Sequence, residues 1–409
     1  MTGISPATVK ADPDRLYQAN AEAAEFFQRH LSGHQPATSY LSQRGIADAA
    51  EAGSPWQLGY APTGWTTTVN HLRSRGFGDD EIYAAGLASH DRHGRLIDRF
   101  RDRLTFPVHD PAGRVLGFTA RDLSGDPDTP KYLNTPETRV YRKGEVLYGL
   151  GPQLQNPPAG DRAPVVVTVE GPTDAIAVAT MAQETAGNTP VYAASPCGTA
   201  LTDRQLHQLH QQLPDANLAV AFDGDTAGRR AFTRTYPLLR SWPGRRYGIE
   251  LPDGRDPAEL LAEHGPAAGL AELAGRAKPA ARMAAALLIE QLIEQGRITR
   301  PREWVADRLL AYEAIADYFV DDPADTPALA REAATRLGIT EGEVVQGVID
   351  HAVPDREPTS IPEAKVQRAR EAVARRQATL RRDRSDELEP ATPTRTADAT
   401  RQPGLVRAA

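Results

Sequence analysis

The chain has 409 residues, of which 25% are charged and 40% are hydrophobic, and its net charge is −7. This composition is typical of a soluble protein with two or three globular domains, and it argues against a generally basic coat protein for nucleic acid. No apolar stretch approaches the roughly 20 residues that span a bilayer, and residues 1–10 have no apolar signal core, so we expect a cytoplasmic protein. The single cysteine, Cys197, excludes an internal disulfide framework and a cysteine-rich zinc ribbon within this chain, so zinc is not expected.

The first part of the chain, residues 1–150, is predicted to be a mixed α+β domain. Residues 16–31 and 38–44 place apolar side chains at helical spacing. Two strand-like runs follow at 104–110 and 114–123. The sequence DPAG between these runs favours a tight hairpin turn, which indicates antiparallel strands.

The second part, residues 163–270, is predicted to be an α/β domain. A polar, proline-rich linker at 151–164 precedes it. Beyond the linker, strand-like runs alternate with helical runs, and this order predicts a mainly parallel sheet covered by helices. The strand-like runs are VVVTVE, PVYAAS, NLAVAFD and RRYGIEL, and the helical runs between them are 173–183, 203–213 and 226–240.

The last part of the chain lacks strand patterns. Residues 281–351 show helical periodicity, which predicts a helical domain over 280–353. From 354 to 409 the composition is rich in Arg, Glu, Thr and Pro with few large apolar residues, so we expect a charged and largely disordered tail. Within it, the basic stretch 363–384 could contact phosphates or simply be solvated.

Four carboxylates follow strands of the predicted sheet. Glu170 ends the first strand and Asp174 lies in the first turn of the next helix, while Asp223 and Asp225 follow the third strand around Gly224. Because the carboxyl ends of parallel strands meet at one edge, these acids should converge there. Oxygen ligands with access to water suit Mg²⁺ or Mn²⁺ and metal-assisted phosphoryl chemistry. A single strand-end acid more often caps a helix, but acids at two matched strand ends favour a metal site.

The two acidic motifs resemble the Toprim family. EGPTDAIA at 170–177 is similar to its glutamate motif, and DGDTAGRRA at 223–231 is similar to its Asp-x-Asp motif. Toprim domains occur in primases, in topoisomerases and in some nucleases, so this resemblance implies metal-dependent phosphodiester chemistry without choosing among them. The segments 98–123, 130–150 and 197–202 resemble, in the same order, segments of DnaG-type bacterial primases.

The resemblance to DnaG-type primases implies a set of phosphate-binding residues. In that family an arginine, two lysines and an asparagine near the strand before the Toprim domain contact template and nucleotide, which implies these roles for Arg121, Lys131, Asn134 and Lys143. Lysine is rare in this arginine-rich chain, and its compact ammonium approaches a triphosphate differently from a forked guanidinium. Tyr132 could stack on a base, although packing is the commoner role for an aromatic side chain on a half-buried strand.

The resulting hypothesis is a DNA primase that makes short RNA primers on single-stranded DNA from ribonucleoside triphosphates. Glu170, Asp223 and Asp225 would be the catalytic carboxylates and would bind Mg²⁺ or Mn²⁺, with Asp174 as a supporting ligand and Asp256 as a ligand to an auxiliary metal. The alternatives are a Toprim nuclease or topoisomerase fragment that acts on DNA, and a non-catalytic replication adaptor.

The sequence departs from the primase pattern in two places. DGRDPAE supplies Asp253 and Asp256, but Ala258 stands where a second acid commonly follows the proline, so a weaker auxiliary metal site is expected. The cysteine-rich zinc module that usually precedes the catalytic core is missing. This absence points to a plasmid, phage or integrative-element primase, or to a chain that works with a separate template-recognition subunit.

Two further groups of residues allow more than one interpretation. Arg99, Arg101 and Arg103 alternate along a predicted strand, where they could line a nucleic-acid groove or form a solvated edge. Residues 300–350 resemble the helical region that leads to helicase-interacting elements in primases. The same residues are equally explained as a folded structural appendage, so a replicative helicase is a candidate partner only.

Overall fold

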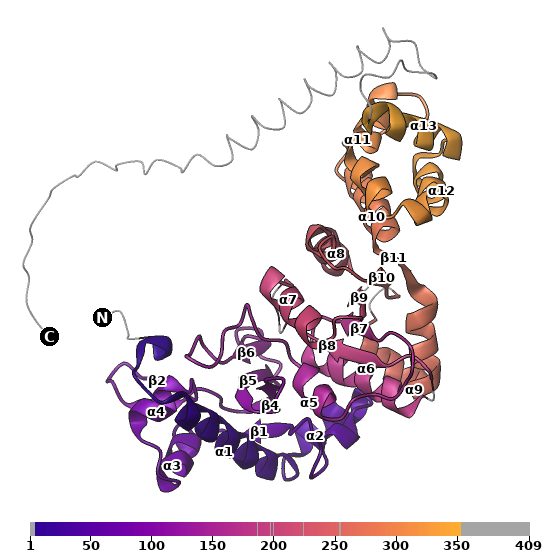
Figure 1. Ribbon diagram of the computed structural model, residues 1–409. Helices are drawn as coiled ribbons and strands as arrows, with labels where there is room; N and C mark the ends of the chain where they lie inside the picture. Colours follow the sequence, from indigo (N-terminus) through magenta and orange to yellow (C-terminus); the bar gives the residue numbers. More distant parts are fainter. Residues whose placement is uncertain are drawn as a thin grey trace, which may run out of the picture.

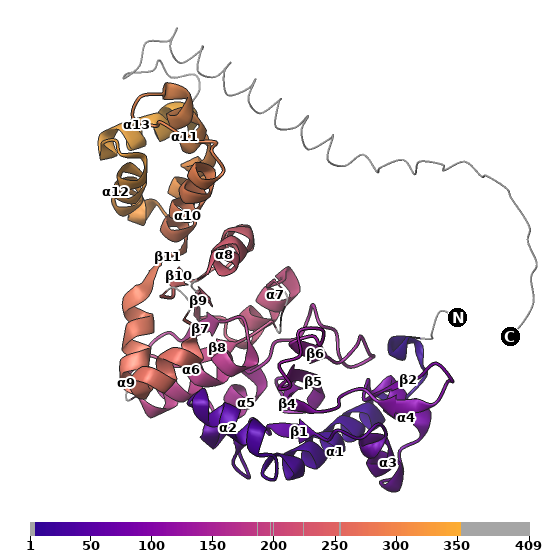
Figure 2. The ribbon, with the colours of Figure 1, turned by 180° about the vertical axis from the view of Figure 1, so that it is seen from behind.

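The computed structural model describes residues 5–352 except 186, 197, 199, 224, 253 and 254. The predicted tail at 354–409, with its basic stretch, lies outside the described residues, and so do Cys197, Gly224 and Asp253. Figure 1 shows the described chain as an N-terminal domain, a central α/β domain and a helical domain in chain order. Figure 2 shows the same order from behind, with the α/β domain between the other two.

The N-terminal domain is built on an antiparallel sheet with strand order β1-β4-β5-β6. Its strands are β1 (Gly59–Ala61), β4 (Arg103–His109), β5 (Val115–Asp122) and β6 (Tyr132–Asn134), with a small β2 (Ala88–His90) and β3 (Leu96–Asp98) pair beside it. Its helices are α1 (Pro13–Leu31), α2 (Gln35–Gln43), α3 (Thr67–Ser74) and α4 (Asp79–Ala84), with short 3₁₀ turns at Pro6–Thr8 and Ala47–Ala50. The predicted α+β character and both predicted helices are confirmed.

The predicted hairpin turn lies between β4 and β5. Asp110 Oδ1 accepts hydrogen bonds from the backbone N–H groups of Ala112, at 3.0 Å, and Arg114, at 2.9 Å. Gly113 has φ +84°, a left-handed conformation that glycine adopts without steric cost. The DPAG sequence therefore forms this turn through an aspartate that satisfies backbone donors and a glycine that permits the reversal.

The α/β domain has a mainly parallel sheet with strand order β11-β10-β9-β7-β8. Its strands are β7 (Val165–Thr168), β8 (Val191–Ala194), β9 (Asn217–Phe222), β10 (Arg246–Glu250) and β11 (Ala277–Pro279). Its helices are α6 (Pro172–Glu184), α7 (Asp203–Gln212), α8 (Thr226–Leu239) and α9 (Pro257–Arg276), the last kinked at Gly265. The predicted alternation is confirmed, whereas the short antiparallel strand β11 was not predicted.

The helical domain consists of α10 (Ala280–Glu294), α11 (Val305–Asp321), a 3₁₀ turn (Pro323–Asp325), α12 (Thr326–Leu337) and α13 (Glu341–Ala352). Its attachment to the α/β domain is polar as well as apolar. Tyr236 Oη in α8 donates to Asp321 Oδ2 at 2.7 Å, and Arg240 Nε lies 2.9 Å from Asp321 Oδ1. In the part of the chain that the structure describes, no helix is long and apolar enough to cross a membrane.

One apolar core joins the N-terminal domain to the α/β domain. Successive residues of β9 point to opposite faces of the parallel sheet, as in any strand. Leu218 packs with the core that includes α8 and the helical domain. Ala219, on the other face, belongs to a core that also contains Leu104 and Phe106 of β4. The sheet edge is therefore held in place against the N-terminal domain by shared packing.

Two interpretations of the sequence are wrong, the first of them only over residues 151–155. The expected linker at 151–164 begins with part of α5 (Leu150–Gln155), whose Leu150 and Gln153 are buried. A Cβ on Gly151 would meet Asp110 O at 2.5 Å, so this glycine permits close packing of α5 on the hairpin. The proline and glycine that indicated a linker instead begin a short buried helix.

The three alternating arginines do not lie along one strand, because β4 begins only at Arg103. Arg99 donates to the carbonyl oxygen of Asn134, and Arg101 lies 4.4 Å from the centroid of the Trp65 ring. Arg103 is only 6% exposed and donates to Pro130 O at 2.9 Å. Each arginine therefore has its own local contact, and the three do not form a single face.

The buried His109 makes stability depend on pH. Burial lowers the pKa of His109 to about 4, and its Nε2 lies 3.1 Å from Gln57 Oε1. Between about pH 6.5 and pH 4 this histidine is protonated in the unfolded chain but neutral in the folded protein. The free energy of unfolding therefore falls as pH drops, by ~3 kcal/mol at most. We expect His109→Gln to keep more of its neutral-pH stability at pH 4.5 than wild type, measured by urea unfolding. An equal loss in both proteins would contradict this assignment.

Candidate functional site

The acidic edge of the parallel sheet is formed where β7 and β9 end. These strands are neighbours, with Thr168 opposite Val220, so the residues that follow them come together. The backbone N–H of Asp223 donates to Glu170 Oε1 at 3.3 Å. Ser195, which follows β8, donates from its Oγ to the carbonyl oxygen of Glu170 at 2.8 Å. The strand order predicted this meeting of Glu170 and Asp223, and the structure has it.

The remaining two acids begin helices beside this edge. Asp174 lies in the first turn of α6 and is only 6% exposed. Asp225 is the N-cap of α8, where its Oδ1 accepts from Gly228 N at 2.7 Å. A Cβ on Gly228 would lie 2.2 Å from Asp223 O, so glycine at this position lets the first turn of α8 approach the backbone of Asp223. Asp225 thus has the helix-capping role that a strand-end acid often has, at the same edge as the others.

Burial and mutual repulsion raise the pKa values of these carboxyl groups. The pKa of Asp223 is raised to about 7, by burial first and then by the charges of Glu170, Asp256 and Asp225. Burial and the nearby Asp256 and Asp223 raise the pKa of Asp174 well above its usual range. Burial also raises the pKa of Glu170, with the charges of Asp225 and Asp256 adding to it. The edge therefore concentrates negative charge in a poorly solvated place.

The donor chemistry of this edge suits a divalent cation. Asp174 Oδ1 is buried without a hydrogen-bond partner among the described residues. Carboxylate oxygens are the ligands that Mg²⁺ and Mn²⁺ prefer, and a cation would offset the repulsion that raises the pKa values. Within the described residues, no three acidic, histidine or cysteine side chains are already grouped closely enough to hold one ion. These carboxylates therefore fit a divalent cation by the chemistry of their donor atoms.

Asp256 is occupied by other contacts. It is the N-cap of α9, and its Oδ1 accepts from Glu259 N at 2.9 Å. Its Oδ2 forms an ion pair with Arg44 at the end of α2, and Arg44 also pairs with Glu259 Oε1 at 3.2 Å. The Arg44 side chain is only 19% exposed. Asp256 is thus held by a guanidinium from the N-terminal domain, and Ala258 beside it is buried.

A cluster of basic and aromatic side chains faces the acids from the N-terminal domain. Arg121 Cζ lies 4.5 Å from the centroid of the Tyr40 ring and 5.4 Å from that of Tyr132. Arg121 Nη1 donates to Tyr132 Oη at 3.0 Å. Burial raises the pKa of Tyr132 to about 12, and the negative charge of Asp174 contributes to the rise. A Cβ on Gly171 would lie 3.8 Å from Tyr132 Oη, so the Tyr132 side chain reaches the residues between Glu170 and Asp174.

The three other predicted binding residues lie on or near β6. Lys131 directly precedes β6, and its positive charge offsets part of the rise in the pKa values of Glu170 and Asp223. Asn134 ends β6 and pairs with Thr119 of β5. Lys143 lies in the loop after β6, where its backbone N–H donates to Glu137 Oε1 at 3.1 Å. The structure therefore brings Lys131 to the acids, while Lys143 belongs to a loop that contacts α7.

Sequence reasoning missed Tyr40 and Arg44. Both lie on α2 or at its end, four residues apart, so they share one face of the helix. That face meets Arg121 and Asp256, which are far away in the chain. A polar pair at helical spacing within TSYLSQRG was a usable signal, but its partners depend on how the two domains pack.

Comparison with known proteins gives a consistent result. Residues 26–153 match the family described as DNA primase catalytic core, N-terminal domain, and residues 167–261 match the Toprim-like family. A DNA primase of Mycolicibacterium smegmatis is 38% identical over 289 residues, which cover 68% of this chain and 43% of that protein. The chain thus spans less than half the length of this curated relative.

Solved structures show the same likeness in three dimensions. The RNA polymerase domain of the Mycobacterium tuberculosis primase DnaG superposes with a TM-score of 0.62 at 33% identity, covering 76% of this chain and 97% of that one. A DnaG primase catalytic domain bound to single-stranded DNA gives 0.59 at 30% identity, covering 81% of this chain and 98% of that one.

Fold and acidic edge together define a Toprim-containing primase catalytic core, in which an α/β domain faces an α+β domain. Among such proteins, the chain belongs to the DnaG-type bacterial primase family.

The Arg44 ion pairs are expected to stabilise the junction of the two domains. Arg44→Gln leaves the partly buried Asp256 and Asp174 without their compensating charge, so we expect a loss of about 2 kcal/mol in the free energy of unfolding. As a control, Arg331→Gln removes an ion pair with Glu341 whose side chains are 71% and 48% exposed. This control should cost less than about 1 kcal/mol. Equal losses for the two variants in denaturant unfolding would refute the role given to Arg44.

Proposed function

We propose that this protein is a DNA primase, which synthesises short RNA primers on single-stranded DNA by template-directed nucleotidyl transfer. The observation that carries the proposal is that acidic residues of the α/β domain lie next to a basic residue of the N-terminal domain. Glu170 and Asp223 follow strands of the Toprim sheet, and Lys131, whose charge acts on both acids, directly precedes β6 of the N-terminal sheet, where Tyr132 contacts Arg121. The relatives reported above are primases or domains of primases, and one of them is bound to single-stranded DNA.

The acidic edge is the proposed site of a divalent cation. Glu170, Asp223 and Asp225 would hold Mg²⁺ or Mn²⁺, with Asp174 in support. When bound, the ion supplies positive charge that neutralises the phosphates of the incoming nucleotide. Asp256 is also placed near this edge, but its helix-capping bond and its ion pair with Arg44 favour a positioning role over metal binding.

The basic residues of the N-terminal domain are proposed to hold template and nucleotide. Lys131 is placed to bind phosphates beside Glu170 and Asp223, because its charge already acts on both. Arg121 Nε is buried without a hydrogen-bond partner among the described residues, so the guanidinium retains a donor. Asn134 and Lys143, on either side of the loop after β6, would contact the same ligands. Tyr132 supports Arg121 through its hydroxyl, and we propose this packing role over base stacking.

The reaction is attack of a 3′-hydroxyl on the α-phosphate of a ribonucleoside triphosphate, with pyrophosphate as the leaving group. In this arrangement the chain's own residues contribute by positioning the reacting groups. The N-terminal sheet orients the phosphates, and the shared apolar core keeps it in register with the acidic edge. Catalysis of phosphoryl transfer depends mainly on such preorganised charge and on positioning of the reactants.

Initiation is proposed to involve a second protein. The chain spans 43% of the length of the curated relative reported above, so these residues correspond to only part of that primase. We propose that a separate template-recognition subunit or a replicative helicase assists the choice of start site. An origin on a plasmid, phage or integrative element stays a prediction from the sequence.

The primary test is primer synthesis on single-stranded DNA with labelled ribonucleotides and Mg²⁺ or Mn²⁺. We expect metal-dependent products from the wild type and a loss of at least about 100-fold in Asp223→Ala, because removal of one site charge is costly in phosphoryl transfer. Asp215→Ala is the matched control, since this exposed acid precedes β9 at the opposite edge of the sheet. Absence of product on all templates, with and without the helicase, would overturn the proposal, and cleavage of the DNA would indicate a nuclease.

The role of Lys131 predicts a defect in nucleotide use. Lys131→Ala should raise KM for ribonucleotides about tenfold, because a charge-assisted contact to phosphate is lost. Lys131→Arg should recover part of this loss, since it restores the charge with a different geometry. Lys10→Ala, which lies before α1, should behave as wild type. An unchanged KM in Lys131→Ala, in steady-state assays with saturating template, would remove Lys131 from the binding set.

A further inference from the structure

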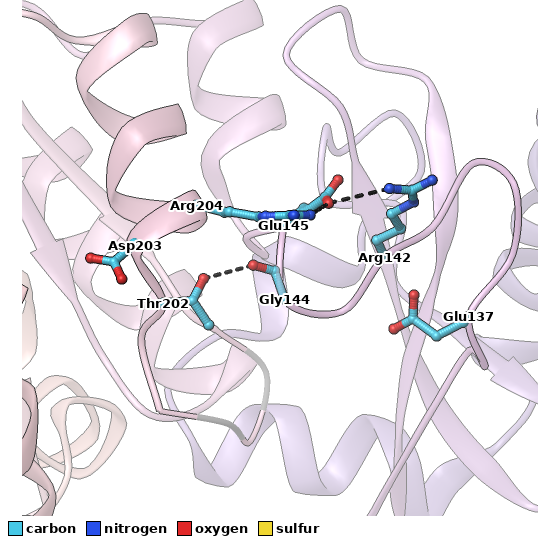
Figure 3. A pocket seen from close by; sticks show the side chains of 7 residues that line it. All are labelled: Glu137, Arg142, Gly144, Glu145, Thr202, Asp203 and Arg204. Carbon is cyan, nitrogen blue, oxygen red and sulfur yellow. Dashed lines mark hydrogen bonds and ion pairs between the residues drawn. The ribbon is translucent and has the colours of Figure 1, made fainter.

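A hollow separates the loop after β6 from the start of α7. Its volume is about 630 Å³, and Figure 3 shows that side chains from both domains line it. The lining residues are Glu137, Arg142, Gly144 and Glu145 from the loop, and Thr202, Asp203 and Arg204 from the α/β domain. The two sides are joined by a hydrogen bond from Thr202 Oγ1 to Gly144 O at 2.6 Å. The hollow thus lies directly beside Lys143, one of the proposed nucleotide-binding residues.

Two guanidinium groups converge on one carboxylate oxygen in this hollow. Arg142 Nη1 lies 3.5 Å from Glu145 Oε1, and Arg204 Nη1 forms an ion pair with the same oxygen. Figure 3 shows Glu145 between the two arginine side chains, which reach it from opposite sides. The arginine side chains are 62% and 72% exposed, whereas Glu145 is 28% exposed. This arrangement of three residues is called the Arg142–Glu145–Arg204 bridge below.

A second hollow, of about 440 Å³, lies on the other side of the bridge and shares Arg142 and Glu145 with the first. One wall is a face of α7 that carries Gln208, Gln211 and Gln212, and the opposite wall carries Arg114 and Arg139. Arg114 Cζ lies 4.1 Å from the centroid of the Tyr17 ring. Arg139 donates to Ala11 O, and no carboxylate in the described part of the chain pairs with it. The two hollows thus share the Arg142 and Glu145 side chains of the bridge, and each is lined in part by α7.

The chemistry of the bridge is that of a phosphate site occupied by a carboxylate. Ion pairs of exposed arginines contribute little free energy, so another anion can replace the Glu145 carboxylate between Arg142 and Arg204. A phosphodiester has the same charge and two oxygens that match the forked guanidinium. The amide groups along α7 can donate to and accept from nucleotide bases, and the stacked Tyr17–Arg114 pair offers a flat surface to a base.

We propose that a phosphodiester group of single-stranded nucleic acid displaces Glu145 from between Arg142 and Arg204, and that the strand continues along α7 from the first hollow into the second. The inference rests on the proposed function, because that function supplies the strands, a DNA template and an RNA product. A continuous strand, rather than a small anion, is favoured by the hollows on both sides of the bridge and by the row of amides beyond it. Glu145 then acts as a displaceable competitor that weakens binding of the strand.

Glu145→Gln is expected to bind single-stranded nucleic acid more tightly than the wild type does. Loss of the competing carboxylate should tighten binding of a single-stranded oligonucleotide by on the order of fivefold, because the two guanidinium groups become available. Binding is measured by fluorescence anisotropy on the full chain in EDTA, without nucleotide. Asp203→Asn is the matched control, because this acid lines the same hollow and Figure 3 shows it turned away from the bridge. It removes the same charge and should change affinity by less than about twofold.

Arg204→Gln is the complementary variant, and its high exposure makes it tolerant of substitution. It should weaken binding and reduce the slope of log affinity against log salt by about 0.7, as expected for one lost contact to a single-strand phosphate. In the Glu145→Gln/Arg204→Gln double variant, the gain from Glu145→Gln should largely disappear, because the two sites act through one contact. Thermal unfolding checks that each variant is folded.

Parallel titrations with DNA and RNA of the same base sequence identify the strand. A larger gain for DNA assigns the path to the template, and a larger gain for RNA assigns it to the product. If Glu145→Gln binds neither strand more tightly than Asp203→Asn does, or if it only lowers the melting temperature, the bridge is a structural contact and the proposal is overturned. These measurements need no synthesis, so their failure is separate from failure of the primer assay.

Discussion

Repulsion between the half-buried carboxylates that follow β7 and β9 is the constraint on which the rest of the structure depends. Glu170 and Asp223 follow neighbouring parallel strands, so backbone geometry forces them together whatever the electrostatic cost. That cost is visible in the raised pKa of Asp223. The repulsion in such a group of acids is relieved by protonation, by a bound cation or by positively charged side chains.

The N-terminal domain delivers part of that positive charge. Arg44 comes from the end of α2 and Lys131 from the start of β6, and each acts on acids of the other domain. Their positions depend on the apolar core that β4 shares with the Toprim sheet. Packing and electrostatics therefore support one another: the core sets the distance between the domains, and the ion pairs make that distance favourable.

Much of this arrangement could be predicted from the sequence. Alternating strands and helices predicted the parallel sheet, and the position of Glu170 and Asp223 after two of its strands predicted their meeting. The partners of Arg44 could not be predicted, because residues 44 and 256 meet only through the packing of two domains. Residues 151–155 were expected to belong to a linker because proline and glycine usually indicate loops. Here these residues begin α5, and Gly151 allows this helix to pack closely on the hairpin.

The burial of α5 has a consequence for how the chain can be divided. Segments between domains are usually exposed, but this one begins with Leu150 and Gln153 inside the protein and reaches the surface only from residue 155 onward, and the strands on both sides of it contribute to one core. A Toprim sheet produced by itself would present the apolar face that β4 normally covers. We therefore expect these two domains to fold as one cooperative unit, and because β9 and α8 also share a core with the helical domain, loss of either neighbour would expose an apolar face of the α/β domain.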